Sequence, residues 1–506
     1  MKIAFITDIE GSINFFNNAI AVSPLLTYNT TGNLTFTDNT SYFVFGGDLI
    51  DKGPHDTFLC QLLVTFKLKH PSRVHLLLGN RDLNKLRYAA ELSDQDLARD
   101  ISTIPKPHWD LSVPSIHQYL QSIATTTSST LTQVNTKTNR LKWMLLHTLG
   151  CRDTFEFRRQ EIARETNNAH ITDIQVTTSF ITSVTDPTSY FRQFLNLGCI
   201  AVRLADTIFV HGALDINTFG FVPDNNTKFE MPTSKSTGTH IDNVDEWISA
   251  INNYLTAGLK DFEQRPNWNA SRTSRGGESL MALQNRDAMY GRSVVSNCFS
   301  DGGCITTKTA ELQRKEKLLH AATDPHAFNK LYSDPFDTTV VEWLLKGGIC
   351  RQVVGHKPSS DCPAVLAGSV TGVEIVSADT SFSDMSAADN RGNAASAVTI
   401  YVDEKKGTSY LVIEGVLHDG TEHRAKFPTL KIGKDGNGGN GGSGGGGKVE
   451  IEGNEEKEEC GDPYVGTLIE DDWWVQTKVG MQYRLIRGAG RNWETKMVDE
   501  VVKCNL

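Results

Sequence analysis

The sequence predicts an α/β fold for this chain, and three observations support the prediction. Short apolar runs typical of buried strands alternate with segments of helical periodicity over residues 1–90. These runs are followed closely by a polar residue, as strands are at the ligand-binding edge of open α/β sheets. The 506 residues are 39% hydrophobic and 22% charged, the balance of an ordinary globular protein. This length suits one large catalytic domain with insertions, or two domains.

The N-terminal region predicts βαβ units. Residues 3–7 form a short apolar run, residues 12–20 have helical periodicity, and residues 42–45 form a second apolar run that leads into Gly46-Gly47-Asp48. A helix is expected to follow from Asp56, which can cap it. The helix presents one apolar stripe, made by Phe58, Leu59, Leu62, Leu63 and Phe66.

A third strand is expected at residues 74–78, an apolar run suited to burial on both faces that ends in Gly79-Asn80. From residue 92 to residue 199 the pattern becomes helical and irregular, which predicts an inserted helical cap. Arg158 and Arg159 are expected on the solvated face of one of its helices. Residues 1–91 and 200–430 together are predicted to form the catalytic domain.

Two further strands are expected before histidines, at residues 207–210 and 352–354, with helices at 244–255 and 340–345. The second of these helices can be capped by Asp337. Three more strand-like runs with intervening turns predict a second, antiparallel sheet. These runs are residues 373–376, 397–402 and 410–416.

The C-terminal region changes composition. Residues 433–447 are mostly Gly, Asn and Ser, and an acidic run follows at 455–459, so residues 431–460 are expected to be a linker or loop. Residues 461–506 are apolar enough to pack as a strand-rich tail. This tail is expected to be either a last pair of strands on the main body or a small separate module.

Composition excludes several classes of protein. The net charge of −10 argues against a nucleic-acid polymer as partner, since such binding needs a concentrated positive surface. The opening MKIAFITD lacks a signal-peptide pattern, and no apolar stretch approaches the ~20 residues of a membrane span. Nine scattered cysteines without a CxxC pair indicate neither a zinc cage nor a disulfide framework. A cytoplasmic location without membrane partners is therefore expected.

Five polar residues each follow a predicted strand: Asp8, Asp48, Asn80, His211 and His356. They could converge at one edge of the fold, because sites assemble at the carboxyl ends of strands in open α/β sheets. Carboxylates, an amide oxygen and imidazoles are ligands that can hold two divalent ions. Two such ions can clamp a phosphate and lower the pKa of a shared water, so that hydroxide attacks phosphorus in line.

The motifs around these residues resemble those of the calcineurin-like metallophosphoesterases, especially the phosphoprotein phosphatase and diadenosine tetraphosphatase branch. The strings occur in the family's order over residues 1–90 and 200–415: TDIEG (7–11), GGDLIDKGP (46–54), GNRD (79–82), VHGAL (210–214), VGHKP (354–358) and VSADTSF (376–382). The resemblance implies a four-layer β-sandwich flanked by helices, interrupted here by the helical insertion. Pro358 stands where general phosphodiesterases of the superfamily have another histidine, which favours the phosphatase branch.

Metal ligands follow from the resemblance by position. Asp8 and Glu10 would bind the first of two divalent ions, and Asp48 would bridge the two. The second ion would be held by Asn80, His211 and His356. Manganese, magnesium, iron or zinc would suit such a site.

Two residues depart from the family pattern. Glu10 replaces a histidine ligand, which makes the first metal position all-carboxylate and favours Mn²⁺ or Mg²⁺. Arg81 replaces the histidine that pairs in the family with the acid matching Asp51 and protonates the leaving group. An arginine can bind phosphate with two hydrogen bonds, but it does not give up a proton at neutral pH.

Other candidate residues surround this pair. Lys52 takes the place of a phosphate-binding arginine, and Arg292 could add a further phosphate contact. Arg81 could alternatively form a structural ion pair with Asp51 or with Asp82. For Asp379, orienting His356 and starting a turn are both open.

The resemblance implies a metal-dependent phosphoric ester hydrolase that uses metal-activated hydroxide on a phosphomonoester, either a phosphoprotein or a small phosphorylated metabolite. A first alternative is a nucleotide polyphosphate hydrolase, whose acidic leaving group needs no protonation. A second alternative is a catalytically impaired scaffold protein that keeps the metal or phosphate pocket. A protein partner could bind through the insertion or the tail.

Overall fold

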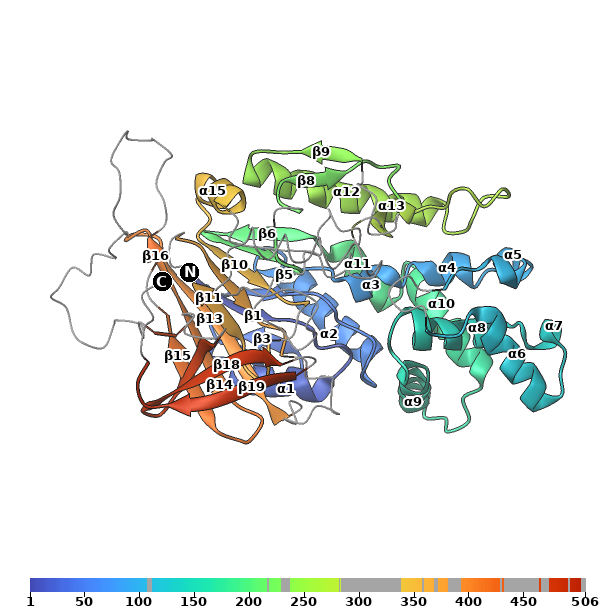
Figure 1. Ribbon diagram of the computed structural model, residues 1–506, viewed down its shortest axis with the longest axis horizontal. Coiled ribbons are helices and arrows are strands. Elements are labelled where there is room, and N and C mark those ends of the chain that lie inside the picture. Colours follow the sequence, from blue (N-terminus) through green and yellow to red (C-terminus); the bar gives the residue numbers. More distant parts are fainter. Residues whose placement is uncertain are drawn as a thin grey trace.

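Two β-sheets packed face to face form the centre of the protein in the computed structural model (Figure 1). The structure describes residues 1–106, 112–215, 218–228, 237–281, 283, 338–356, 359–367, 372–380, 393–427, 430–431, 464–465, 473–489 and 492–501. The predicted Asp337 cap, the phosphate contact Arg292, and the Gly-rich segment 433–447 lie outside these residues.

The first sheet carries three N-terminal strands that run parallel, in the order β1-β4-β5. Strands from residues 395–431 extend it antiparallel on the other side of β1, in the order β13-β14-β15, and β16 pairs with β14. The bounds are β1 Lys2–Ile6, β4 Tyr42–Phe45, β5 Val74–Leu76, β13 Ala395–Asp403, β14 Thr408–Val416, β15 Glu422–Lys426 and β16 Leu430–Lys431.

The second sheet has a parallel centre, β7-β10-β12, with β6 and β11 antiparallel at its edges. The bounds are β6 Ala201–Leu204, β7 Thr207–Val210, β10 Arg351–Val354, β11 Ala364–Ala367 and β12 Glu374–Ser377. The expectation that the three late strands form one antiparallel sheet was wrong. Instead, β12 pairs parallel with β10 in the second sheet, whereas β13 and β14 join β1 in the first.

An apolar layer holds the two sheets together. Phe5 and Val44 of the first sheet and Phe209 and Val353 of the second all belong to this buried cluster, and the rings of Phe5 and Phe209 stack with centroids 5.8 Å apart. Helices α1 (Ile13–Val22) and α2 (Asp56–Lys69) pack on the first sheet, and α12 (Val244–Gln264) packs on the second. This arrangement confirms the predicted α/β sandwich with flanking helices.

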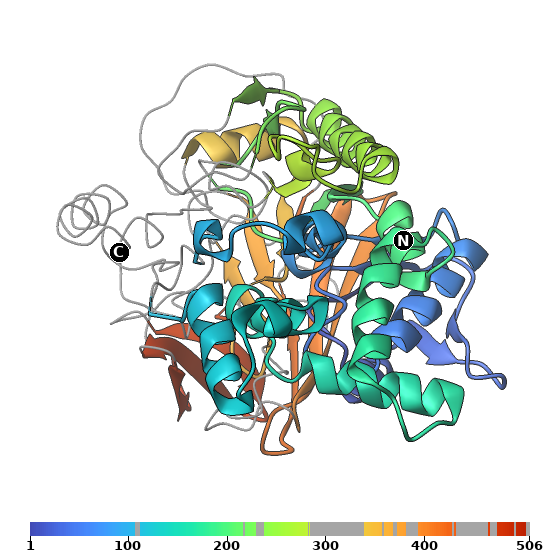
Figure 2. The same cartoon turned by 90° about the vertical axis from the view of Figure 1, so that its right-hand side faces the viewer.

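Short helices fill the region predicted to be an insertion, and they extend to one side of the sandwich (Figures 1 and 2). Two more helices, α3 and α4, lie between β5 and the start of the predicted insertion. The helices are α3 Asn80–Asn84, α4 Arg87–Glu91, α5 Asp94–Leu97, α6 Ile116–Thr127, α7 Leu131–Val134, α8 Lys137–Trp143, α9 Thr154–Thr166, α10 Asp173–Thr185 and α11 Tyr190–Leu197. The predicted domain boundaries at residues 92 and 199 remain a prediction.

The C-terminal residues form an antiparallel sheet of three strands, β17 (Trp474–Val479), β18 (Gln482–Ala489) and β19 (Asn492–Val498). Its apolar side chains, among them Val475 and Leu485, belong to the same buried cluster as the layer between the two large sheets. The tail therefore packs on the main body through strand β15.

Smaller elements complete the described chain. They are two hairpins, β2 (Leu26–Tyr28) with β3 (Leu34–Phe36) and β8 (Phe221–Pro223) with β9 (Gly238–His240), and the helices α13 (Glu278–Met281) and α15 (Thr338–Lys346), with a 3₁₀ turn at Ile101–Thr103 and a π-helical turn at Met144–Thr148. None of the described helices combines the length and apolarity that a bilayer span requires.

Candidate metal centre

The five polar residues predicted at strand ends follow β1, β4, β5, β7 and β10. The two sheets meet at these ends, because Leu77 after β5 forms a parallel bridge to Cys199 before β6. The backbone N–H of Asp8 also donates to the carbonyl of Gly47, at 3.0 Å, which joins the turns after β1 and β4. Strands from both sheets therefore deliver side chains to one place.

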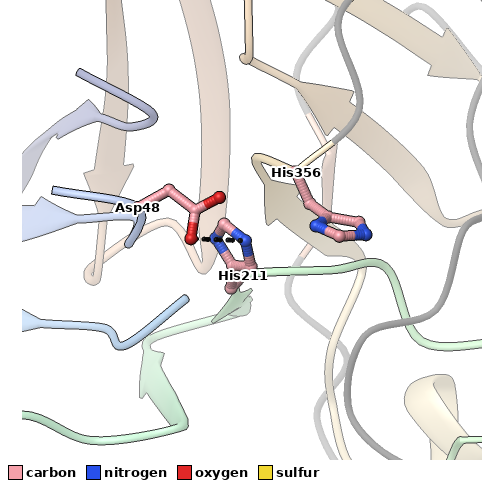
Figure 3. Close-up of side chains that lie close together, drawn as sticks. All are labelled: Asp48, His211 and His356. Atoms are coloured by element: carbon pink, nitrogen blue, oxygen red, sulfur yellow. Dashed lines mark ion pairs between the residues drawn. The ribbon is translucent and has the colours of Figure 1, made fainter. Parts of the chain in front are cut away.

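Four of the predicted ligands lie together. Ligand atoms of Asp48, His211 and His356 all lie within 4.8 Å of one another (Figure 3). Asn80 completes the group, since its Oδ1 lies 3.2 Å from His211 Nε2 and 3.0 Å from His356 Nδ1. These are the residues that the sequence assigned to the bridging position and to the second ion.

The hydrogen bonds of His211 make this group suitable for a cation. Its Nδ1 lies 2.8 Å from the carbonyl oxygen of Gly46, which can only accept, so Nδ1 carries a proton there. In the neutral ring this leaves the lone pair of Nε2 facing the amide oxygen of Asn80, another acceptor. A bound cation satisfies both atoms, and a carbonyl that holds the far nitrogen is the usual support for a histidine ligand.

The charges around the group favour a positive charge. Burial opposes protonation of His211, but the carboxylates of Asp48 and Asp8 raise its pKa to about 10. Burial would raise the pKa of Asp48, yet His211 and Arg81 hold it below its ordinary value. The negative charge of the carboxylates therefore stabilises a proton on His211. A divalent cation bound at the same place would neutralise more of this negative charge than a proton does.

Asp8 lies beside the group rather than within it. Both of its carboxylate oxygens accept from the backbone N–H of His356, at 3.2 and 3.1 Å. Burial and the nearby carboxylate of Asp379 raise the pKa of Asp8 well above its ordinary value. A carboxylate in this position is costly without a cation, which suits Asp8 to a ligand role.

Backbone strain is concentrated at the site. Asp8, Glu10, Asp48, Asp51 and His356 all have positive φ angles, of 51°, 42°, 53°, 127° and 69°. Non-glycine residues rarely adopt such angles, and they persist where surrounding structure enforces them, often at functional sites. The turns after the strands are therefore shaped to aim these side chains.

Two glycines let the turns approach closely. A Cβ atom at Gly79 would lie 2.0 Å from Oδ1 of Asp48, and one at Gly355 would lie 2.1 Å from Oδ2 of Asp8. Any side chain at either position would displace a predicted ligand. This contact explains why both residues directly before Asn80 and His356 are glycine.

Asp82 connects the turn after β4 to the turn after β5 by hydrogen bonds. Its buried carboxylate accepts from the backbone N–H groups of Asp48, Leu49 and Gly79, at 3.0, 3.0 and 2.8 Å. Burial and the neighbouring Asp48 raise the pKa of Asp82 to about 7. The residue ties the turn after β4 to the turn after β5 and does not pair with Arg81 in the way the sequence left open.

Glu10 lies between two cationic side chains. Its Oε1 is 2.7 Å from Nε of Arg81, and its Oε2 is 2.9 Å from Nζ of Lys52. Among the described residues, Glu10 is not part of the group of possible metal ligands formed by Asp48 and the two histidines. A role of Glu10 toward a first ion remains a prediction.

Arg81 also contacts Asp51. Its Nη1 lies 3.3 Å from Oδ2 of Asp51, and the Nζ of Lys85 lies 2.6 Å from the same oxygen. Sequence reasoning overlooked Lys85, although it stands one helical turn after Arg81 and so on the same side. Asp51 is thus neutralised by two cations, and Arg81 spans from Asp51 to Glu10.

The helical insertion reaches this region through Asp56. Asp56 was expected to cap α2, but the cap residue is His55, and Oδ1 of Asp56 accepts from the backbone N–H of Asp51 at 3.1 Å. Its Oδ2 lies 3.3 Å from Nη2 of Arg158. The placement of Arg158 on a solvated face was also wrong, since the side chain is buried against α2.

Residues 1–143 match the family model described as calcineurin-like phosphoesterase. The match covers the turns that carry Asp8, Glu10, Asp48 and Asn80, and it ends before His211 and His356. It supports the calcineurin-like superfamily and a phosphoesterase activity, and it does not distinguish between branches. Metals are general in this superfamily, and the group around Asp48 is a fitting place for one. A search of curated proteins finds no match.

The solved structures that match this chain include phosphatases. One is a cold-active protein-tyrosine phosphatase from the psychrophile Shewanella sp., with 13% identity, coverage of 84% of this chain and 80% of that chain, and a TM-score of 0.34. Another is a protein serine/threonine phosphatase from Saccharomyces cerevisiae with similarity to human phosphatase PP5, with 10% identity, 86% and 81% coverage, and a TM-score of 0.30.

Proposed function

We propose that the protein is a metal-dependent phosphoesterase that hydrolyses a phosphomonoester, either on a protein or on a small metabolite. The convergence of Asp48, Asn80, His211 and His356 at the ends of four strands from two sheets carries the proposal. Two divalent ions are proposed, one held by these four residues and one by Asp8, Glu10 and Asp48. Mn²⁺ or Mg²⁺ suits the carboxylates best.

When bound, the ions would supply Lewis acidity toward a phosphate oxygen and a nucleophile at neutral pH. The protein's own part is to bind and orient the phosphate. Arg81 and Lys52 place two positive charges beside Glu10 at the edge of the group, with side chains that are 20% and 30% exposed. A phosphate that displaces their contacts with Glu10 would meet a guanidinium able to donate two parallel hydrogen bonds.

A second candidate is the hydrolysis of nucleotide polyphosphates, and the environment of Arg81 favours it. Arg81 stands between three carboxylates, which raise its pKa even though burial opposes this, so it holds its proton. A phosphate leaving group is acidic enough to depart without one, whereas an alkoxide is not. The third candidate, a scaffold protein without turnover, is an outcome of the same experiment.

The test is hydrolysis of a panel of phosphomonoesters, phosphodiesters and dinucleoside polyphosphates with added Mn²⁺. Turnover of monoesters supports the first proposal, and cleavage of pyrophosphate bonds supports the second. If no substrate of the panel is hydrolysed and calorimetry still detects Mn²⁺ binding, the protein is a binding protein and not an enzyme. Full activity after exhaustive chelation would overturn metal dependence.

A further inference from the structure

The loop that follows His356 is held by two parts of the fold. On one side, Ser359 is attached to the turn after β12, where its N–H donates to the carbonyl of Asp379 at 2.7 Å. Its hydroxyl donates to the carbonyl of Ser377 at 2.9 Å. The C-terminal sheet β17–β19 supplies the other side, although its residues come more than a hundred positions later.

Two side chains of the C-terminal sheet make this contact. Nη1 of Arg484 on β18 lies 2.6 Å from Oδ1 of Asp361. Nε2 of Gln476 on β17 donates to the carbonyls of Ser359, at 3.2 Å, and Cys362, at 2.9 Å. All of these contacts are buried, so they fix the loop without competition from water.

The loop needs such support because its conformation is strained. Ser360 has a φ of 89°, which is unfavourable for any residue with a side chain. Asp361 is fully buried, and burial would raise its pKa, but Arg484 and His418 lower it to about 2. A charged carboxylate in the interior would be unstable without the arginine.

We infer that Arg484 and Gln476 are positioning residues for the metal centre: they hold residues 359–362, and through this loop they keep the imidazole of His356 beside Asn80 and Asp48. The backbone of His356 is itself strained, with a φ of 69°, and its N–H is tied to Asp8. A loop released at its far end would let this backbone relax and move the ring away from Asn80. The inference rests on the proposed function, since it assumes that His356 binds a cation.

The C-terminal sheet β17–β19 is therefore a structural support of the metal centre and not an independent module. Supporting groups around a metal ligand typically change metal affinity 10–100-fold when removed. Since Arg484 and Gln476 act through a loop, an effect of about tenfold is expected, at the lower end of that range.

The experiment is a calorimetric titration of the chelator-treated full-length protein with Mn²⁺, for the unmodified chain and four variants. Arg484→Met and Gln476→Leu should each weaken Mn²⁺ binding about tenfold, and Arg484→Lys should recover part of the loss because it keeps the charge opposite Asp361. Gln476→Leu is the milder change, because Oε1 of Gln476 has no hydrogen-bond partner among the described atoms. It decides the question if Arg484→Met does not fold.

Arg140→Met is the matched control. Arg140 forms a similarly buried ion pair with Asp96, at 3.2 Å, inside the helical insertion. The control should lower the melting temperature and leave Mn²⁺ affinity unchanged. Wild-type affinity in both Arg484→Met and Gln476→Leu would overturn the inference while the proposed function stands, whereas an unmodified protein that does not bind Mn²⁺ would overturn both.

Discussion

Nε of Arg81 lies 2.7 Å from Oε1 of Glu10. These are the two positions at which the sequence departs from the histidines of the calcineurin-like motifs, so the two departures form one ion pair. Both side chains are largely buried, with 20% and 8% of their surface exposed. Removing Arg81 leaves Glu10 with Lys52 as its remaining cation. Removing Glu10 leaves Arg81 with Asp48 and Asp51. Each change alters the charge balance beside Asp48, which makes the two positions interdependent.

Double-mutant analysis should reveal this interdependence. Glu10→His and Arg81→His should each lower the free energy of unfolding, and the double variant should lose less than the sum, with a coupling of about 1–3 kcal/mol. Urea denaturation measures all three. The exposed pair Arg424 and Glu414 is the control, at 3.1 Å, and its coupling should stay below about 1 kcal/mol. Additive losses at Glu10 and Arg81 would mean that the contact is not energetically important.

Asp48→Asn should abolish divalent metal binding and phosphatase activity. The substitution keeps the shape of the side chain and its acceptor for the N–H of Arg81, at 2.9 Å, but removes the charge that the two histidines face. Calorimetry with Mn²⁺ and phosphate release should fall together, while the melting temperature of the metal-free protein changes little. Asp38→Asn, at the surface, should alter neither. Retained turnover in Asp48→Asn would disprove the role of this group.

The strand ends could be predicted from sequence because their signals are local. A short apolar run followed closely by an aspartate, an asparagine or a histidine, in four of the five cases with an adjacent glycine, predicts both a buried strand and the turn after it. Strands β1, β4, β5, β7 and β10 all occur where such runs predicted them. The sheet that each late strand joins is not a local property. Strands β12 and β13 have similar apolar patterns, and only tertiary packing separates them.

The charged environment of the site was harder to predict for the same reason. Lys85 was overlooked because a lysine on a short helix is usually solvated, and only its burial against Asp51 reveals its role. Arg158 was misplaced since the face of a helix that is buried depends on its partner, here α2. The candidate ligands could be named from motifs in the sequence. The charged side chains around them come from segments that are distant in the sequence, and their positions depend on tertiary packing.

Acid should destabilise the protein through His423. Burial and the nearby Arg484 lower its pKa to about 4, partly offset by Asp361, from an ordinary value of 6.5. Between pH 4 and pH 6.5 the folded protein therefore binds fewer protons than the unfolded chain. The contribution of His423 to the free energy of unfolding is fully present above pH 6.5 and is lost as the pH falls toward 4. This one side chain should cost about 2 kcal/mol between pH 7 and pH 5.

Urea denaturation at the two pH values, compared between the unmodified protein and His423→Gln, isolates this contribution. The variant should lose about 2 kcal/mol less on acidification, whatever its stability at pH 7. An identical pH dependence in both proteins would show that His423 is not held neutral in the folded state.

Glu161 should tie helix α9 to the start of helix α2. Its Oε1 accepts from the backbone N–H groups of Thr57 and Phe58, at 2.8 and 3.2 Å, and so caps α2 in place of the N-cap residue, whose side chain makes no capping bond. Glu161→Ala should cost about 2–4 kcal/mol, because it removes the cap and an ion pair of the buried Arg158. Glu161→Gln should cost less, since an amide oxygen still accepts. Thermal melts that rank the two variants in the opposite order would exclude the capping role.

The rate at which the proposed enzyme expels its leaving group should depend on Arg81. Its Nη1 is 3.3 Å from Asp51, but a guanidinium among carboxylates holds its proton, so the enzyme should be fast on aryl phosphates and slow on alkyl phosphates. Arg81→His places a titratable ring beside Asp51 and should raise alkyl-phosphate turnover relative to aryl-phosphate turnover. General acid catalysis is typically worth about 10²–10⁴ in rate, so the change in the ratio of the two rates should be large.

Arg81→Gln, which removes the charge without adding an acid, should slow both substrates equally. If the unmodified enzyme shows no dependence on leaving-group pKa, another group, with Lys85 the nearest described cation on Asp51, must supply the proton.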